Sequence, residues 1–237
     1  MYYIGWDIGI KNLAYCIIEQ LPNKSEIIHE LEIINLIDEP IILYCSCLNK
    51  NGKICKSKAT YFTKINEKIY YCNKHYNLLS TKEKKEIKSI KPPKKCNKYS
   101  LEELGLNLFK ALDSSPLFLK CENIIIENQP VLKNPTMKSI QIMLYSYFLI
   151  RNKNINIIKL VNASNKLKVY KGNIPNDENE KIDNIKDKYR KNKMTAILHA
   201  KLMIDNDLIL EKYNNHKKKD DLADAYLMTK YLINKLK

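Results

Sequence analysis

Short apolar runs separated by polar breaks open the chain. Residues 2–6, 13–19 and 27–36 are rich in β-branched and aromatic side chains, and Gly9 lies in the first break. Runs of this length predict two strands joined by a tight turn and followed by a third, which together form an antiparallel meander. Asp7 closes the first run, where it is either a site residue at a strand end or part of an ordinary turn.

A continuous apolar run marks the middle of the chain. Ile124, Ile125 and Ile126 are followed by Glu127 and, three residues later, by Pro130. Three adjacent β-branched residues predict a strand that is buried on both faces, and a proline, which has no N–H, ends its hydrogen-bond ladder. Open α/β sheets place their active sites at the carboxyl ends of central strands. Glu127 is therefore a candidate site residue, with a solvent-facing glutamate as the alternative.

Helical periodicity surrounds this strand. Ser100 and Glu103 have the spacing of a capping box, and Asn134-Pro135 has the form of an N-cap followed by proline at the first helical position. The polar, lysine-rich stretch 162–190 is expected to be a mobile basic loop. The remaining predicted elements are a helix after Ser100, a helix over 136–150, a strand over 154–161, a helix over 194–204 and a final helix from Asp220.

The final helix carries a group of aspartates. Asp221 and Asp224 are three residues apart and share one helical face, and Asp220 is close to both. Like charges on one face cost stability unless a cation lies between them. The helix dipole is an alternative explanation for Asp220 and Asp221, but it does not explain Asp224, which lies beyond the first turn.

The charge balance indicates a polyanionic partner. Lys+Arg 41 against Asp+Glu 26 gives a net charge of +15, for which nucleic acid is the natural complement. Lysine supplies nearly all of this charge and suits contact with phosphates better than bidentate reading of bases. The sequence has neither an apolar run of membrane-spanning length nor a signal-like start, so we expect no membrane and an intracellular, reducing compartment.

Cysteines concentrate in residues 43–98, which we expect to form an insertion between residues 1–42 and 99–237. Cys47, Cys55, Cys72 and His75 have the spacing of a structural zinc site, and four ligands leave no open coordination position. Cys45 is an alternative to Cys47, and reduced cysteines without metal are the other explanation. Residues 82–98, rich in lysine around two prolines, are expected to be an extended basic linker.

Three stretches together resemble a known family. Asp7-Ile-Gly-x-Lys-Asn12, Ile-Glu127-Asn-Gln-Pro130 and Asp221-x-x-Asp224-Ala are similar to the RuvC-type Holliday junction resolvases of the RNase H-like superfamily, in the branch found in poxviruses and other large DNA viruses. The resemblance implies an α/β fold with a mixed five-stranded sheet flanked by helices. It also implies a homodimer that makes paired symmetric nicks in four-way DNA junctions. The cysteine-rich insertion departs from the common core of this family.

The resemblance implies a catalytic set of Asp7, Glu127, Asp221 and Asp224 that binds two Mg²⁺ ions, with Mn²⁺ able to substitute. Hard cations of this kind prefer oxygen ligands, and two such ions hydrolyse a phosphodiester by activating water and stabilising the leaving oxygen. Asp220 falls outside the family spacing. A basic residue near the scissile phosphate is Lys166 or Lys168, with a solvated lysine as the alternative. The lysines expected to contact DNA are Lys11, Lys133, Lys138, Lys166 and Lys168.

Other functions fit parts of the pattern. A nuclease of the same fold could act on flaps, forks or RNA–DNA hybrids. A zinc-stabilised protein could also bind branched DNA without cutting it, although such a binder gains nothing from carboxylates that face phosphates. An actin-like ATPase shares the strand order but needs a longer chain. The family resemblance places the protein in the host cytoplasm or at a viral replication site.

Overall fold

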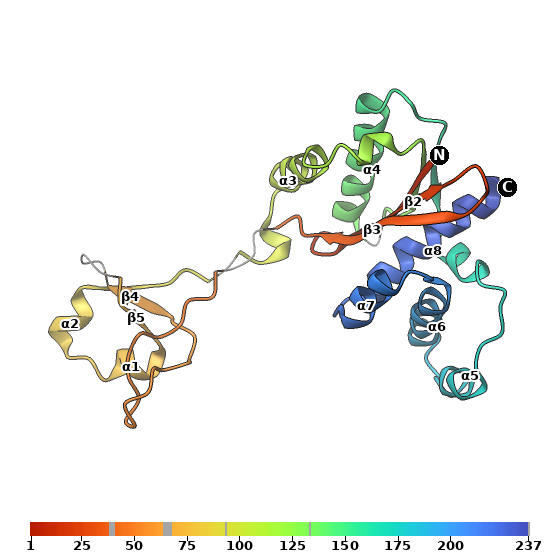
Figure 1. The fold of residues 1–237 in the computed structure, drawn as a ribbon. Coiled ribbons are helices and arrows are strands. Elements are labelled where there is room, and N and C mark those ends of the chain that lie inside the picture. The colour runs from red at the N-terminus through yellow and green to blue at the C-terminus, as the bar shows by residue number, and fades with distance from the viewer. Residues whose placement is uncertain (38–40, 64–67, 93, 133, 237) are drawn as a thin grey trace. The chain divides into compact units, whose positions relative to one another are not determined.

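The computed structural model describes residues 1–37, 41–63, 68–92, 94–132 and 134–236. The chain forms two compact units, and Figure 1 labels the helices and strands of each. Met1–Ile37 and Tyr99–Lys237 form the first, here called the main unit, and Asp38–Lys98 form the second, here called the cysteine-rich unit. Among the described residues, no helix is long and apolar enough to cross a bilayer.

The main unit is built on a mixed five-stranded sheet with the order β3-β2-β1-β7-β8. β1 pairs antiparallel with β2, and β2 with β3, whereas β7 is parallel to both β1 and β8. The meander expected from the first three apolar runs and the buried central strand are both present. The bounds are β1 Tyr2–Asp7, β2 Leu13–Gln20, β3 Glu26–Ile34, β7 Asn123–Glu127 and β8 Ile157–Val161.

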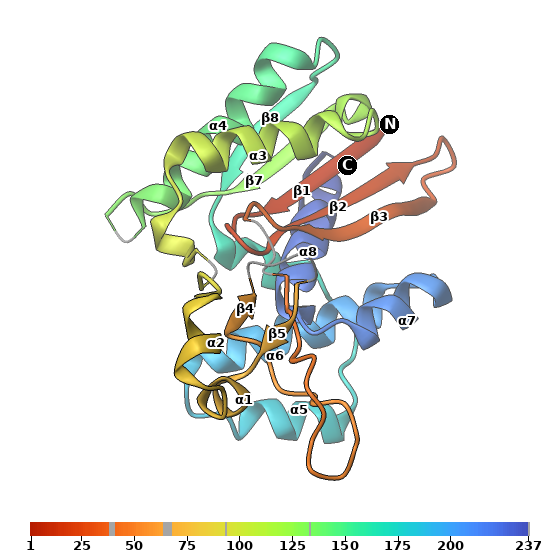
Figure 2. The same cartoon turned by 90° about the vertical axis from the view of Figure 1, so that its left-hand side faces the viewer.

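Helices cover both faces of this sheet (Figures 1 and 2). α3 (Leu101–Asp113) and α4 (Pro135–Arg151) cover one face, and α8 (Lys219–Leu236) covers the other, with α6 (Lys188–Met203) packed on α8. Successive side chains of a strand point to opposite faces. Trp6 therefore points toward α4, with its ring centroid 6.2 Å from that of Phe148.

The other face of β1 brings α8 unusually close. A Cβ atom on Gly5 would lie 2.4 Å from Thr229 Oγ1 and 2.8 Å from the Ala225 carbonyl oxygen. A side chain at position 5 would therefore push α8 away from the sheet. Asp7 follows two residues later on the same face of β1, so it points toward the first turns of α8.

The two helices on the opposite face start where the sequence predicts. Glu103 N donates to Ser100 Oγ over 3.1 Å, and Ser100 N donates to Glu103 Oε2 over 2.7 Å, which completes the capping box. Met137 N donates to Asn134 Oδ1 over 3.2 Å at the start of α4. These caps satisfy N–H groups that have no partner inside the helix.

One expectation for the second half of the chain is wrong, and one of its helices was not predicted. The stretch 162–190 is not a loop throughout, because it contains the 3-10 helix η3 (Ala163–Lys168), α5 (Asn176–Asp183) and the start of α6. α7 (Asp207–Asn215) was also not predicted. α5 buries a single side chain, Ile182, so its sequence has too few apolar positions to show a helical period.

The cysteine-rich unit has a small sheet of its own. Its strands are β4 (Tyr61–Thr63), β5 (Tyr70–Tyr71) and β6 (Ile87–Ser89), in the order β5-β4-β6, with the short helices α1 (Asn73–Asn77) and α2 (Thr81–Lys85). The linker expected over 82–98 is wrong in its first half, which forms the end of α2 and the strand β6. Two further 3-10 turns are η1 (Cys96–Lys98), which ends the unit, and η2 (Phe118–Lys120) in the main unit.

Candidate active site and metal centre

Two carboxylates lie side by side at the ends of parallel strands. Trp6 of β1 pairs with Ile126 of β7, so Asp7 and Glu127 are the next residues of their strands. The preceding residue on the same face of β7, Ile125, belongs to the apolar core under α8. Glu127 therefore points to the same side of the sheet as Asp7. Asp7 is only 9% exposed, which is unusual for an aspartate.

The helix α8, which covers this face of the sheet, supplies the remaining acids. Ala225 of α8 lies against Gly5 of β1. Asp221 and Asp224 come before Ala225 in the helix, by one turn and by one residue, and so lie toward the ends of β1 and β7. These carboxylates line a cavity of about 380 Å³ together with Asp7 and Glu127. The structure thus brings together all four acids expected from the sequence. Asp220 lines the same cavity, as do residues of η3 and α6.

The acids disfavour one another's charge. Burial raises the pKa of Asp7 well above its usual value, and a hydrogen bond to Glu127 and the charges of Glu127 and Asp224 add to this effect. Burial also raises the pKa of Asp224 to about 6, although Lys166 opposes the shift. The pKa of Asp221 is raised by burial and by the charge of Asp220. Bound cations would relieve this repulsion.

Two lysines reach into the cavity and pair with aspartates. Lys166 of η3 forms an ion pair with Asp224, and Lys193 of α6 forms one with Asp220. Burial would raise the pKa of Asp220, but the ion pair with Lys193 outweighs it and holds this pKa below its usual value. The charge of Asp220 is therefore already balanced by the ammonium group of Lys193. In contrast, Asp221 Oδ2 is buried and finds no hydrogen-bond partner among the described residues.

The donor set fits a divalent metal ion. Carboxylate oxygens are the ligands that Mg²⁺ prefers, and it is commonly bound by a few carboxylates together with water and substrate phosphate. Asp7, Glu127, Asp221 and Asp224 supply such oxygens from three elements, and the orphaned Oδ2 of Asp221 needs a partner. An uncompensated buried carboxylate oxygen is costly, so a cation at this position would stabilise the folded site.

Sequence reasoning missed a group of amides that holds Glu127. Gln129 Nε2 donates to Glu127 Oε2 over 2.9 Å, and Gln129 N donates to Gln141 Oε1 over 2.6 Å. Gln141, on α4, is fully buried. A buried glutamine on an otherwise apolar helical face is a visible sequence signal, since buried polar groups are held by hydrogen bonds. Lys193 was also missed, because it is one of many lysines.

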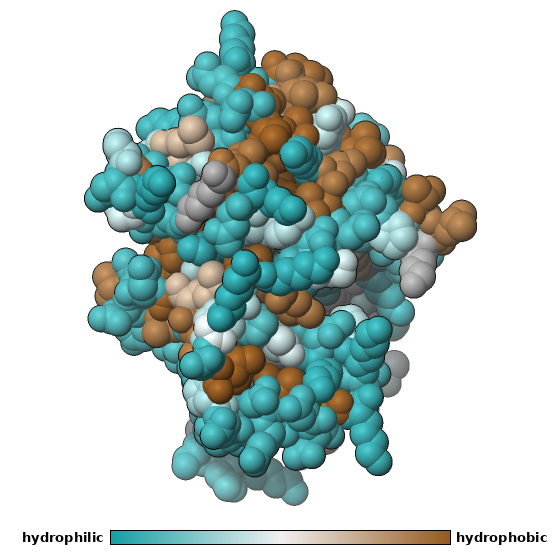
Figure 3. Space-filling view, turned by 90° about the vertical axis from the view of Figure 1, so that its right-hand side faces the viewer, coloured by the Kyte–Doolittle hydropathy of each residue, from teal (hydrophilic) through white to brown (hydrophobic). Residues whose placement is uncertain are grey.

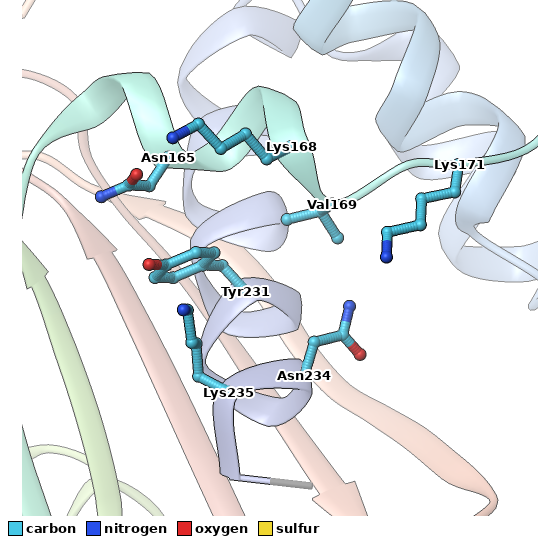
Figure 4. A pocket seen from close by; sticks show the side chains of 7 residues that line it. All are labelled: Asn165, Lys168, Val169, Lys171, Tyr231, Asn234 and Lys235. Carbon is cyan, nitrogen blue, oxygen red and sulfur yellow. The ribbon is translucent and has the colours of Figure 1, made fainter.

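The five lysines expected to contact DNA have different environments. Lys166 is at the acids, whereas Lys168 is exposed and lines a separate cavity of about 700 Å³ beside Lys171, Tyr231 and Lys235 (Figure 4). Lys138 Nζ donates to Asn128 Oδ1 and Gln141 Oε1, over 3.0 and 3.3 Å, and so supports the segment after Glu127. Lys11 is exposed. Lys133 lies outside the described residues.

A second candidate metal site lies in the cysteine-rich unit. Cys45, Cys55, Cys72 and His75 place one ligand atom each within 4.8 Å of one another. His75 Nδ1 is 3.2 Å from Cys45 Sγ and 3.5 Å from Cys72 Sγ. All three of these cysteines are buried and none forms a disulfide. Three thiols and one imidazole in this arrangement are a donor set for tetrahedral Zn²⁺.

The ligand set differs from the favoured expectation at one position. The group contains Cys45, the stated alternative, in place of Cys47. Ser46 N donates to Tyr70 O over 2.8 Å, which ties the backbone beside Cys45 to β5 and hence to Cys72. Cys47 lies farther along the hairpin, where its carbonyl accepts from Cys55 N over 2.8 Å, and it packs against the other three cysteines from outside.

The fold of the chain is also found in a solved Holliday junction resolvase. The crystal structure of fowlpox virus resolvase with its substrate Holliday junction DNA matches with a TM-score of 0.52 at 17% identity, covering 100% of both chains. The yeast mitochondrial Holliday junction resolvase matches with a TM-score of 0.48 at 19% identity, over 97% of this chain and 78% of that one. The fowlpox likeness confirms the expected fold class.

A viral relative is closer in sequence. An uncharacterised protein of Acanthamoeba polyphaga mimivirus is 32% identical over an alignment 311 positions long, which covers 98% of this chain and 74% of that protein. The chain belongs to the family of this large-DNA-virus protein. No family model matches the chain.

Proposed function

We propose that this protein is a Holliday junction resolvase, a metal-dependent endonuclease that makes paired symmetric nicks in four-way DNA junctions. One observation carries the proposal: Asp7, Glu127, Asp221 and Asp224 line one cavity at the strand ends of a fold shared with the fowlpox resolvase. That enzyme is described in complex with Holliday junction DNA. The net charge of +15 supports a nucleic-acid substrate.

The four acids hold two Mg²⁺ ions in this proposal, and Mn²⁺ can replace them. Such ions, when bound, supply an activated water and neutralise charge on the leaving 3′ oxygen. The protein's own part is to fix the ligands. β1 and β7 hold Asp7 and Glu127 on a rigid sheet, Gln129 orients the Glu127 carboxylate, and α8 places Asp221 and Asp224 opposite them.

Lys166 takes the role of the basic residue near the scissile phosphate. Its Nζ already lies among the acids, where the charge of Asp224 holds its pKa above the usual value although burial opposes this. A phosphate that enters the cavity offers this ammonium group a second anionic partner. Lys168 is two residues away but lines the other cavity, so it is assigned to more distant contact with the DNA backbone.

Paired nicks require two active sites, and we assign a homodimer. Figure 3 shows hydrophobic side chains gathered on the upper part of one face, at the height where Figure 1 draws α4. Exposed apolar residues on α3 and α4 include Leu106, Ile142, Leu149 and Ile150, which are 62%, 45%, 53% and 77% exposed. Exposed apolar surface of this kind supports association with a second copy.

The zinc ion has a structural role in this proposal and is held by Cys45, Cys55, Cys72 and His75. Four protein ligands leave no open position for substrate. Free thiols persist in reducing compartments. Together with the viral relative, they support an intracellular site of action such as the host cytoplasm or a viral replication site.

The test is cleavage of an immobile four-way junction in Mg²⁺, with a flap and a linear duplex of the same sequence as controls. We expect symmetric paired nicks that EDTA abolishes. Glu127→Gln should reduce cleavage by about 10³-fold with junction binding retained, since it replaces a carboxylate ligand of the metal by an amide. Glu122→Gln, at the opposite end of β7, is the matched control and should cut normally.

Two outcomes would change the assignment. Equal cutting of the flap and the junction would keep the metal site but make the protein a general branch nuclease. Junction binding without cleavage in Mg²⁺ or Mn²⁺ would contradict the proposal and indicate a binding protein.

A further inference from the structure

The cysteine-rich unit carries a disproportionate share of the positive charge. Between Asp38 and Lys98 the sequence has 15 lysines against 5 acidic residues, a net charge of +10 out of +15 for the whole chain. A structural zinc module needs no such excess. The charge therefore indicates that this unit itself contacts a polyanion.

The small sheet of this unit presents two different faces. Phe62 pairs with Tyr70 on one side and with Lys88 on the other, so these three side chains form a row across one face. Tyr61, the neighbouring residue in β4, points to the opposite face because successive side chains alternate. There its ring stacks on that of Tyr76 in α1, with centroids 3.8 Å apart.

The helices lie on the Tyr61 face. Besides the stacked Tyr76, Lys84 of α2 places its Nζ 5.4 Å from the centre of the Tyr76 ring. The candidate metal ligand His75 belongs to α1 itself, one residue before the stacked Tyr76. The metal site and both helices thus occupy one face of the sheet and leave the row of Phe62, Tyr70 and Lys88 on the other.

The row forms a basic and aromatic groove. Its volume is about 320 Å³, and among the described residues its lining contains no carboxylate. The two rings of the row lie in it with Leu43, and Lys68, Lys88 and Lys91 are exposed along it. Aromatic rings in a lysine-lined groove are the arrangement by which proteins bind single-stranded nucleic acid, since bases stack on the rings and phosphates meet the cations.

We propose that this groove binds single-stranded DNA, with unpaired bases stacked on Phe62 and Tyr70 and the backbone held by Lys68, Lys88 and Lys91. The lysines contact phosphate without selecting a base, so the groove binds strands of any sequence. The inference goes beyond the cleavage reaction, because it assigns a second DNA site in a unit that lacks the catalytic acids. Its test measures binding alone and stands whether or not the junction assay detects cleavage.

The test compares a fluorescent twelve-nucleotide thymidine strand with an abasic strand of equal length and charge, by anisotropy at one fixed salt concentration. The protein is the full chain with stoichiometric zinc and Glu127→Gln, which prevents cutting. We expect about tenfold tighter binding of the thymidine strand, the effect of one or two stacked bases. The double variant Phe62→Leu/Tyr70→Leu should lose this preference and keep its affinity for the abasic strand within about twofold.

A matched lysine pair separates charge from stacking. Lys88→Gln should weaken binding of both strands equally and lower the salt dependence of log K by about 0.7. Lys74→Gln, on the exposed surface of α1, should leave the base preference and the salt dependence nearly unchanged.

Photocrosslinking covers the case in which the double variant does not fold, as judged by its zinc content. A strand containing 5-iodouracil should crosslink to Phe62 or Tyr70 in the unsubstituted groove, as identified by mass spectrometry. Equal affinity for both strands, or a preference that survives in the folded double variant, would overturn the proposal. A groove that serves a protein partner would give equal affinities and no crosslink.

Discussion

The two candidate metal sites of this protein relate to their surroundings in opposite ways. In the main unit, the carboxylates lie at the ends of elements that already pack tightly, since Ile125, Ala225 and their neighbours form an apolar core without any metal. Among the described residues of the cysteine-rich unit, the buried cluster consists of Cys45, Cys55 and Cys72 themselves. In the main unit the candidate metal site lies at the edge of an apolar core, whereas in the cysteine-rich unit the candidate ligands are themselves the buried side chains.

This difference has an energetic consequence. Burial raises the pKa of Asp7 and Asp224, and the charge of Glu127 adds to both shifts, so these carboxylates cost stability when no cation is bound. Thiolates around zinc have the opposite effect, since the free energy of zinc binding contributes directly to folding. Metal removal should therefore affect the two units very differently.

The largest expected effect is selective unfolding of the cysteine-rich unit on zinc removal. A zinc chelator in excess Mg²⁺ should expose the lysines between residues 41 and 98 to trypsin, because zinc binding contributes about 10–16 kcal/mol in small metal-dependent domains. Trp6, the single tryptophan, is fully buried in the main unit. Its fluorescence should stay native, and its unfolding midpoint should shift by less than about 2 °C.

Zinc added back should restore resistance to trypsin, and Mg²⁺ should not. If the chelated protein resists trypsin as well as the zinc-loaded protein does, the cysteine-rich unit has an adequate core without metal. The proposed difference between the two units would then be wrong.

The acids of the main unit were predictable because each continues a buried pattern. Glu127 follows Ile125 on the α8 side of β7, and Asp221 precedes Ala225 by one turn on the sheet-facing side of α8. When a carboxylate continues the row of apolar side chains on one face of a strand or helix, the sequence alone predicts the direction in which it points. The direction of the lysine side chains is not, because η3 decides that Lys166 meets Asp224 while Lys168 does not.

Residues outside strong periodic patterns were misjudged. His199 of α6 is 6% exposed, and burial lowers its pKa. Its ring lies 4.9 Å from that of Tyr170, in the stretch expected to be a mobile loop. A packed segment with so few apolar residues buries its neighbours without leaving a signal in its own sequence.

Serine substitutions at Cys45 and Cys47 test which of the two cysteines is the zinc ligand. Cys45→Ser should lower zinc affinity by about 100-fold or more, since it removes a thiolate from the group of four. Cys47→Ser changes a neighbour outside that group and should lower the affinity only severalfold. Competition with a chromophoric chelator measures both, and the reverse order would assign the ligand to Cys47.

The smallest expected effect is a gain in stability from removing a charge in the main unit. Without metal at pH 8, Asp7→Asn should raise the Trp6 unfolding midpoint by about 2–4 °C, which corresponds to about 1 kcal/mol in a unit of this size. The folded state raises the pKa of Asp7, so it binds the proton more tightly than the unfolded chain, and stability falls as pH rises toward the folded pKa. Asparagine cannot ionise, so the gain should be present at pH 8 and absent near pH 4.

In saturating Mg²⁺ the unsubstituted protein should have a higher unfolding midpoint than Asp7→Asn. The carboxylate of Asp7 then binds a cation, and the amide does not. Asp113→Asn is the control, since this exposed carboxylate pairs with Arg151 over 3.3 Å and accepts a hydrogen bond from Tyr147. It should lower the midpoint slightly at pH 8. If Asp7→Asn is destabilising at pH 8 without metal, the buried Asp7 carboxylate does not cost stability in the folded state. The main unit would then gain nothing from losing the Asp7 charge, and the energetic contrast between the two metal sites would be weaker than proposed.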